Sequence, residues 1–136
     1  MQIAFDTDVL IRHYLTDPDE PHQSHVAHAL VEDALESGSI IYLSHVVLVE
    51  AIWVLRSRYK LPKKSMIAFL RSTITDAPFT VPNPVLVDRA IKRFARSKAD
   101  FADCLIAAEA DEANCHSTYS FDQNLDRLSG VTVIQE

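Results

Sequence analysis

The stretch IAFDTDVL, residues 3–10, poses the question on which the fold of this chain depends. Its first three residues are apolar and are typical of a short buried strand. Two aspartates, Asp6 and Asp8, follow where that strand must give way to a turn or a helix. Carboxylates at such a position either cap a helix or bind a metal ion. The remainder of the sequence is needed to discriminate between these two roles.

Apolar segments typical of strands alternate along the chain with segments of helical period. We expect strands at 2–5, 40–43, 79–81, 115–119 and 131–134, and helices at 22–36, 45–57, 63–73, 85–97 and 101–113. Strands separated by helices form parallel sheets that are covered on both faces. The sequence therefore predicts an α/β fold, a three-layer α/β/α sandwich with a central parallel sheet of four or five strands. Sites in such folds collect at the carboxyl ends of the strands, where Asp6 and Asp8 are expected.

Length and composition favour a single domain over residues 1–136. Apolar residues make up 48% of the chain and only two residues are glycine, which indicates a compact, helix-rich protein. The opening residues lack the pattern of a signal peptide, and no apolar run approaches the roughly 20 residues that span a bilayer. Cys104 and Cys115 form no C-x-x-C pair, so we expect neither a disulfide nor a thiolate zinc site. We expect a soluble, cytoplasmic protein that does not contact a membrane.

The formal charge of −6 argues against a protein that coats nucleic acid by bulk electrostatic attraction. Global charge does not exclude a nucleic-acid enzyme, however. An acidic cluster that holds cations contributes to this negative count while it acts on a phosphate substrate.

Glu50 is the only polar side chain in VVLVEAIWVL, residues 46–55, within a helix that we expect to be largely buried. A lone ionised carboxylate in such a place is costly unless it is paired or bound to a cation. A salt bridge to Arg56 or to another arginine is one explanation. A bound metal ion is the other.

Asp100 and Asp103 lie three residues apart in ADFADCLIAA, residues 99–108, so both carboxylates share one face of the first turns of a helix. Capping explains this spacing as well as a metal does, because Asp100 at the N-cap and Asp103 in the first turn both favour the positive end of a helix.

Asp122 follows a predicted strand directly in TYSFDQNLD, residues 118–126, as Asp6 does near the start of the chain. Ser120 and Gln123 have the spacing of a capping box, which explains Ser120 better than it explains Asp122. We expect Asp126 to face solvent on the helix that follows.

Four acids thus fall at predicted strand ends or in the first turns of the next helices: Asp6, Glu50, Asp103 and Asp122. Two carboxylates about 4 Å apart repel each other by roughly 4 kcal/mol at an effective dielectric constant near 20. Mg²⁺ and Mn²⁺ relieve such repulsion because hard cations prefer oxygen ligands. One ion can lower the pKa of a bound water, and a second can stabilise the leaving oxygen of a phosphodiester.

Two further groups of residues, one of arginines and lysine and one of histidines, can be explained as solvent-exposed helix faces. Four basic residues share one face of the helix at 85–97: Arg89, Lys92, Arg93 and Arg96. They form either the solvated face of an amphipathic helix or a set of RNA phosphate contacts close to Asp100. His22, His25 and His28 cannot all reach one ion from a helix, so we expect them to face solvent.

Taken in order, these motifs resemble the PIN-domain ribonucleases, and more narrowly the VapC-type toxins of type II toxin–antitoxin pairs. The resemblance covers essentially the whole chain and is carried by DTDVL, VVLVEAIWVL, ADFADCLIAA and SFD. It implies an endoribonuclease with one or two Mg²⁺ or Mn²⁺ ions, an RNA substrate, a cognate antitoxin and frequent homodimers. The acids that it matches in order are Asp6, Glu50, Asp103 and Asp122. It also gives supporting positions to Asp8, Asp100 and Ser120.

The residues leave two rival classes to test. Aspartate-nucleophile phosphatases also begin with a strand followed by D-x-D, but their pattern has threonine or valine two residues after the second aspartate, where this chain has Leu10. Trapping of an acyl-phosphate on Asp6 would support that class. The second rival is a non-catalytic binding module in which the acids serve only as caps and in salt bridges.

Overall fold

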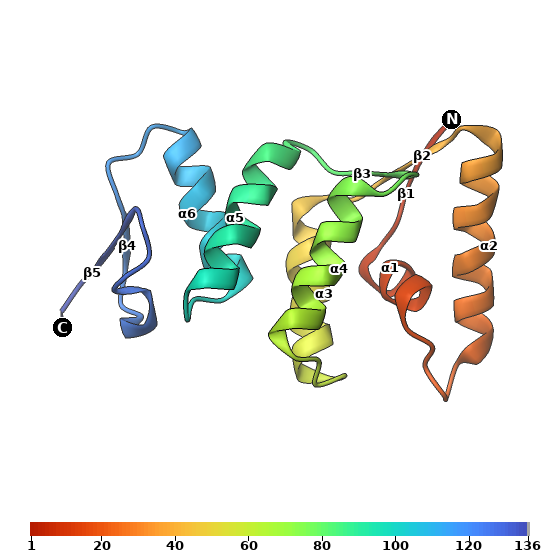
Figure 1. The fold of residues 1–136 in the computed structure, drawn as a ribbon, viewed down its shortest axis with the longest axis horizontal. Helices are drawn as coiled ribbons and strands as arrows, with labels where there is room; N and C mark the ends of the chain where they lie inside the picture. The colour runs from red at the N-terminus through yellow and green to blue at the C-terminus, as the bar shows by residue number, and fades with distance from the viewer. Residues whose placement is uncertain (136) are drawn as a thin grey trace. The chain divides into compact units, whose positions relative to one another are not determined.

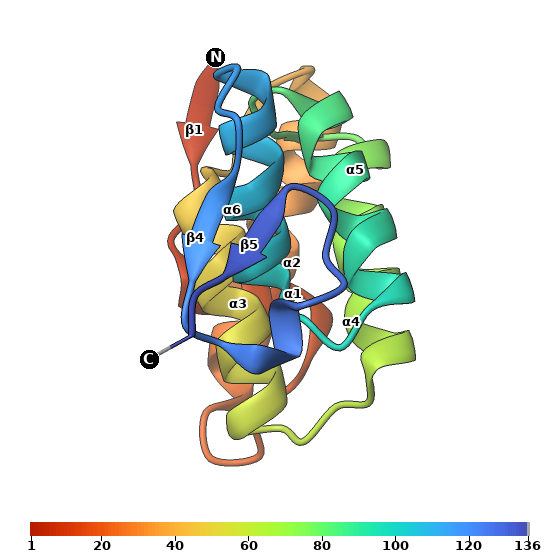
Figure 2. The same cartoon turned by 90° about the vertical axis from the view of Figure 1, so that its left-hand side faces the viewer.

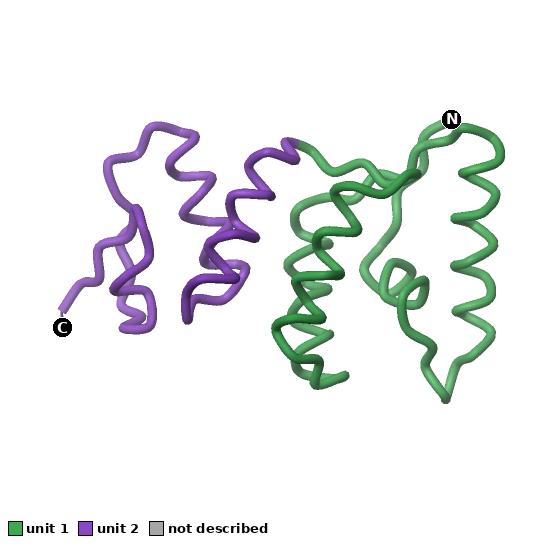
Figure 3. The backbone as a smooth tube through the Cα atoms, in the orientation of Figure 1, with its two compact units in different colours: residues 1–82 green, residues 83–136 purple. Residues whose placement is uncertain are grey.

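The computed structural model describes residues 1–135, so the last residue of the expected 1–136 domain lies outside the described part. The chain divides into two compact units, Met1–Pro82 and Asn83–Glu136 (Figure 3). We refer to them as unit 1 and unit 2 and describe each by itself. That both units belong to a single domain remains a prediction.

Unit 1 contains a parallel sheet and four helices. Its elements are β1 (Gln2–Ala4), α1 (Thr7–Tyr14), α2 (Pro21–Ser37), β2 (Ile40–Tyr42), α3 (His45–Ser57), α4 (Lys63–Thr75) and β3 (Phe79–Thr80). The strand order is β1-β2-β3, and Ile41 of the central strand is opposite Ile3 on one side and Phe79 on the other. In Figure 1, α2 lies on one side of these strands and the α3–α4 pair on the other. The helices thus cover both sides of a sheet whose strands all run in the same direction.

The carboxyl edge of this sheet leads directly into two helices. β1 ends at Ala4 and α1 begins at Thr7, and β2 ends at Tyr42 and α3 begins at His45. Ser44 caps α3, since its side chain accepts a hydrogen bond from the Val47 backbone N–H at 3.2 Å. Because β1 and β2 are parallel neighbours, the first turns of α1 and α3 start from the same edge.

A buried ion pair joins α1 to the loop that follows it. Arg12 and Asp17 are only 6% and 4% exposed, and Arg12 Nη2 lies 3.2 Å from Asp17 Oδ2. Arg12 also donates to Gln23 Oε1 on α2 at 3.0 Å and to the Tyr59 hydroxyl after α3 at 2.6 Å. Arg58 Nη2 contacts Asp17 Oδ2 at 3.0 Å from the surface. One guanidinium therefore ties together three helical segments of unit 1.

Unit 2 consists of two helices followed by a small parallel strand pair. Its elements are α5 (Pro84–Arg96), α6 (Phe101–Glu112), β4 (Thr118–Ser120), the short 3₁₀ helix η1 (Gln123–Leu125) and β5 (Val131–Val133). Asn83 caps α5, because its side chain accepts a hydrogen bond from the Leu86 backbone N–H at 3.3 Å. Phe94 and Phe101 meet edge to face with ring centroids 6.0 Å apart, which packs α5 against α6. Figure 2 shows β4 and β5 running side by side, and Tyr119 is opposite Thr132 in their register.

The structure confirms the predicted α/β fold class. The five strands pair in parallel only, three of them in unit 1 and two in unit 2. All five predicted helices are present with ends within two residues of the prediction, and the helix at 45–57 has the predicted bounds. β4 begins at Thr118, three residues later than predicted, because the polar segment before it belongs to the turn after α6.

Three further expectations concern side chains. His22, His25 and His28 are exposed as predicted, and His28 Nδ1 lies 3.2 Å from His13 Nδ1 on α1. Cys104 is buried, Cys115 is exposed, and both are free thiols. In the described chain, residues 1–135, no helix has the length and apolar character to cross a membrane.

Candidate metal centre

Two of the predicted acids meet at the carboxyl edge of the unit 1 sheet. Asp6 is the N-cap of α1, and its Oδ1 accepts a hydrogen bond from the Thr7 backbone N–H at 2.8 Å. The Thr7 hydroxyl donates to Glu50 Oε1 on α3 at 3.0 Å. Thr7 is buried, whereas both carboxylates are exposed. Thr7 thus contacts both carboxylates, that of Asp6 through its backbone N–H and that of Glu50 through its hydroxyl.

The structure corrects the expected burial of Glu50, which is exposed. The neighbours of Glu50 on the same helical face are Val46 and Trp53, and they are 66% and 65% exposed. α3 is apolar on nearly every side, and such a pattern cannot tell which face packs against the protein. A buried charge in need of a partner is therefore not the reason for the glutamate.

The cap of α1 is Asp6. The helix begins at Thr7, and Asp6 rather than Asp8 occupies the N-cap position. Asp8 lies within the first turn, where its negative charge favours the positive end of the helix. It lines a cavity of about 290 Å³ between α1 and α2, together with residues that include Arg12 and His22. Capping and metal binding are consequently not alternatives for Asp6, because one carboxylate oxygen caps while the other is free to act as a ligand.

Unit 2 brings together three acids from two segments. Asp100 caps α6 as predicted, and its Oδ1 accepts from the Phe101 backbone N–H at 2.7 Å. Burial raises the pKa of Asp103, and the negative charges of Asp100 and Asp122 raise it further, against a hydrogen bond from the Asp100 backbone that lowers it. Asp103 therefore lies close enough to both acids for their charges to act on it.

The segment around Asp122 differs from the predicted capping box. The N-cap of η1 is Asp122 rather than Ser120, and its Oδ1 accepts from the Asn124 backbone N–H at 2.9 Å. Ser120 Oγ instead accepts from the Asp122 backbone N–H at 3.0 Å. The helix is a single 3₁₀ turn, too short to place Gln123 at the third helical position that a capping box requires. Asp126, at the end of η1, is exposed as expected.

The donor chemistry of these residues fits a hard divalent cation. All of the predicted ligands are carboxylates, and no histidine or thiolate is among them. Within residues 1–135, the structure brings no three histidine, cysteine, aspartate or glutamate side chains into an arrangement that could hold a metal. Mg²⁺ in proteins commonly keeps several waters and uses only one or two carboxylates from one place.

Most of the basic face of α5 is already paired. Arg89 contacts Glu112 at 3.5 Å, Lys92 contacts Asp88 at 3.0 Å, and Arg93 contacts Asp111 at 2.7 Å. Arg96, the last residue of α5, has no ion pair or hydrogen bond to any residue of the described chain.

Sequence reasoning missed Thr7 as a functional residue. A hydroxyl residue between two aspartates at the start of a helix was the available signal, but nothing in the local pattern shows that its side chain is buried and directed at a glutamate 43 residues away. The contact depends on the parallel pairing of β1 with β2.

Comparison with known proteins agrees with this architecture. The family model described as the PIN domain matches residues 3–131, nearly the whole chain, and the chain therefore belongs to the PIN-domain family. Over 102 residues the chain is also 23% identical to a VapC ribonuclease from Aquifex aeolicus (strain VF5), an alignment that covers 75% of this chain and 76% of the relative. The resemblance seen in the sequence motifs is thereby confirmed.

Proposed function

We propose that this chain is a Mg²⁺- or Mn²⁺-dependent endoribonuclease and the toxin of a toxin–antitoxin pair. The observation that carries the proposal is the Asp6–Thr7–Glu50 arrangement at the carboxyl edge of a parallel sheet, in a chain that belongs to the PIN-domain family. A relative named as a VapC ribonuclease supports RNA as the substrate. Family membership and local geometry thus support the same class of enzyme.

We assign the ligands of one or two ions to Asp6, Glu50, Asp103 and Asp122. When bound, the ions supply Lewis acidity that lowers the pKa of coordinated water and neutralises phosphate charge. The role of Thr7 is to hold Glu50 in place through its hydroxyl. Such outer partners of metal ligands fix the orientation of the ligand.

Three residues have supporting roles in this proposal. Ser120 fixes the backbone of Asp122 by accepting its N–H. Asp100 caps α6 and adds negative charge beside Asp103. Asp8 adds negative charge in the first turn of α1, next to Asp6 in the chain. Of the basic residues of α5, Arg96 is the one without an acidic partner in the described chain, and we assign contact with RNA phosphate to it.

The proposal also includes two protein partners, an antitoxin and a second copy of the chain, and a cytoplasmic location. Val46 and Trp53 present exposed apolar surface one turn to either side of Glu50, and such surface suits contact with another protein. We assign it to the cognate antitoxin, and we expect the toxin to form homodimers. Two free thiols suit the reducing cytoplasm, where RNA substrates are found.

One observation favours a second candidate, a non-catalytic binding module. Asp6, Asp100 and Asp122 are each the N-cap of a helix, so capping alone could account for their presence. A module of this kind needs no metal, and divalent ions would leave its melting temperature unchanged. Stabilisation by Mn²⁺ that is lost in Glu50→Gln would exclude it, because Glu50 caps no helix.

The experiment that tests the proposal is cleavage of an end-labelled RNA by the purified chain with Mg²⁺, with Mn²⁺ and with EDTA. We expect cleavage with either ion and none with EDTA. When a water attacks phosphorus and the bond to the 3′ oxygen breaks, the products carry a 5′-phosphate and a 3′-hydroxyl. Attack by the ribose 2′-hydroxyl would leave a cyclic phosphate instead.

Product ends and metal dependence are therefore read from the same gel. Replacing the ribose at the cleaved position with deoxyribose serves as the control, because hydrolysis by water does not need the 2′-hydroxyl as nucleophile. Cleavage that persists in EDTA, or products that end in a cyclic phosphate, would contradict the proposed chemistry.

A further inference from the structure

Unit 2 contains a polar cavity whose lining includes none of Asp100, Asp103 and Asp122. Its volume is about 660 Å³, within the range of small-ligand pockets. It lies where the end of α5 and the loop after it meet the segment that contains η1. The residues around it are Ala95, Arg96, Ser97, Lys98, Gln123, Asn124, Asp126, Arg127 and Leu128.

The charges around this cavity are unusual for unit 2. Six basic residues lie between 83 and 135, and three of them, on α5, have acidic partners. The other three, Arg96, Lys98 and Arg127, all line the cavity, and none makes an ion pair or hydrogen bond to a described residue. Asp126 is the single acid in the lining. The cations of unit 2 that lack a protein partner are therefore gathered at one place, which suits an anionic ligand.

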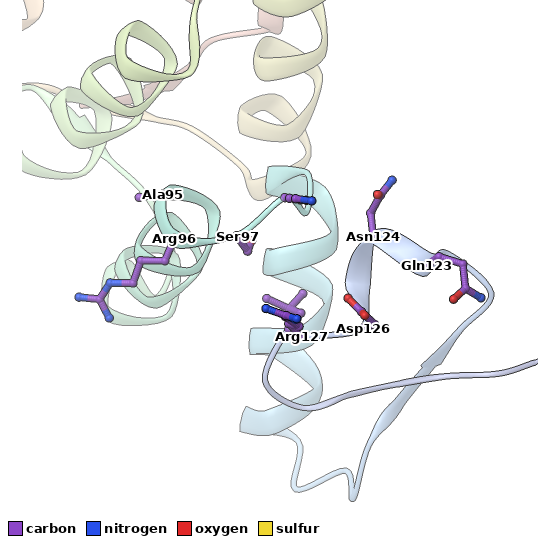
Figure 4. A pocket seen from close by; sticks show the side chains of 9 residues that line it. Ala95, Arg96, Ser97, Gln123, Asn124, Asp126 and Arg127 are labelled. Carbon is purple, nitrogen blue, oxygen red and sulfur yellow. The ribbon is translucent and has the colours of Figure 1, made fainter.

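The side chains around the cavity lie on two sides of Arg127. Figure 4 shows Gln123, Asn124 and Asp126 on one side of Arg127, and the Arg96 guanidinium extending away on the other. Arg96 thus stands at the rim. Carboxamides both donate and accept hydrogen bonds, which suits the edge of a nucleic-acid base. The arginines and the lysine are suited to phosphate.

The cavity and the unit 2 acids belong to the same two chain segments. Lys98 is two residues before Asp100, and Gln123 directly follows Asp122. Residues of both segments line the cavity, so the two segments lie side by side immediately next to Asp100 and Asp122 in the chain. A strand of RNA with one phosphate at the acids can place a neighbouring nucleotide in the cavity.

We propose that this cavity binds a nucleotide of single-stranded RNA next to the cleaved bond, with Lys98 and Arg127 contacting phosphate and Gln123 and Asn124 contacting the base. The proposal rests on the proposed ribonuclease function and adds a substrate-binding subsite to it. Phosphate contacts set affinity and salt dependence, whereas base contacts set sequence preference. The two sets of residues should therefore affect different measured quantities.

The first test measures binding of a labelled single-stranded RNA by fluorescence anisotropy in EDTA, where no cleavage occurs. Lys98→Ala/Arg127→Ala is expected to raise Kd at least tenfold. Each phosphate contact to a single strand contributes about 0.7 to the slope of log K against log salt, so the slope should fall by about 1.4.

The matched control is Arg89→Ala/Lys92→Ala, which removes one arginine and one lysine from the paired face of α5. We expect its Kd to rise less than threefold, and the melting temperatures of both double variants to stay close to that of the unchanged chain. An equal effect of the two double variants would overturn the subsite, as would an unchanged Kd in the cavity variant or failure of the unchanged chain to bind RNA.

Two readouts separate RNA recognition from simple attraction of negative charge. Gln123→Ala/Asn124→Ala should change the ratio of Kd values for oligo-U and oligo-A at least threefold while the salt slope stays the same. Poly-glutamate at equal charge should compete at least tenfold less well than RNA. Stronger competition by poly-glutamate would assign the cavity to an acidic protein segment and overturn the RNA proposal.

The experiments distinguish an error in the proposed RNA subsite from an error in the proposed ribonuclease activity. If the unchanged chain cleaves RNA with Mg²⁺ but the cavity variant binds RNA normally, the ribonuclease proposal stands and the subsite is wrong. If the cavity variant loses RNA binding but the unchanged chain cleaves nothing, the RNA site stands and the ribonuclease proposal is wrong.

Discussion

Asp6→Asn is expected to lower Mg²⁺-dependent RNA cleavage by about 100-fold or more while the protein remains folded. Loss of an outer partner of a metal ligand typically costs 10–100-fold, so loss of a ligand itself should cost at least about 100-fold. Asparagine is as good an N-cap as aspartate, and its amide oxygen can accept the Thr7 N–H that Asp6 now accepts. The substitution therefore removes the charge and keeps the cap.

The measurement is the initial cleavage rate at saturating Mg²⁺, with the melting temperature determined on the same samples. Asp33→Asn on α2 is the matched control, because it removes the same charge from an exposed position in the same unit. We expect its rate to stay within about twofold. A rate for Asp6→Asn equal to that of Asp33→Asn would assign Asp6 to capping alone.

Arg12→Ala should cause the largest loss of stability among the substitutions considered. Removing one partner of a buried ion pair costs about 3–5 kcal/mol, because the remaining charge stays buried. Asp17 keeps its contacts with Arg58 and with the Asp19 backbone N–H, so we expect the lower end, about 3 kcal/mol. For a chain of 136 residues this corresponds to a fall in melting temperature of about 10 °C.

Trp53 is the only tryptophan of the chain and lies in unit 1, so its fluorescence reports the unfolding of that unit. The control is Arg58→Ala, which removes the exposed partner of the same carboxylate and should cost less than about 1 kcal/mol. Arg12→Met/Asp17→Asn should recover part of the loss, since it leaves no buried charge. Equal melting temperatures for Arg12→Ala and Arg58→Ala would show that the buried pair does not stabilise unit 1.

The positions of helices and strands could be predicted because periodicity and caps are local signals. The helix at 45–57 follows from an apolar run interrupted only by Glu50, and the cap at Asn83 follows from residue type alone. The burial of Glu50 was predicted wrongly, because a local pattern that is apolar on nearly every side of a helix does not show which side packs against the protein. Val46 and Trp53 remain exposed on the side that includes Glu50.

Contacts between distant segments could not be predicted from the sequence. The Thr7–Glu50 hydrogen bond depends on which strand pairs with β1, and the buried position of Arg12 depends on how α1, α2 and the end of α3 come together. The capping box predicted at Ser120 was wrong, because several polar residues near a helix start compete for one position and the N-cap is Asp122, two residues later. Asp6 and Asp122 could be singled out in the sequence because few charged residues stand next to predicted strand ends, and their role as metal ligands stays a prediction.

The central claim is that Asp6, Glu50, Asp103 and Asp122 are ligands of one or two divalent metal ions. The most direct test is the Mn²⁺ affinity, by calorimetric titration, of the unchanged chain, Asp6→Asn, Asp103→Asn and the double variant. Each single substitution should weaken Mn²⁺ binding about tenfold or more, and the double variant should bind at least as weakly as the weaker single variant. Mn²⁺ affinity that is unchanged in either single variant would contradict the account.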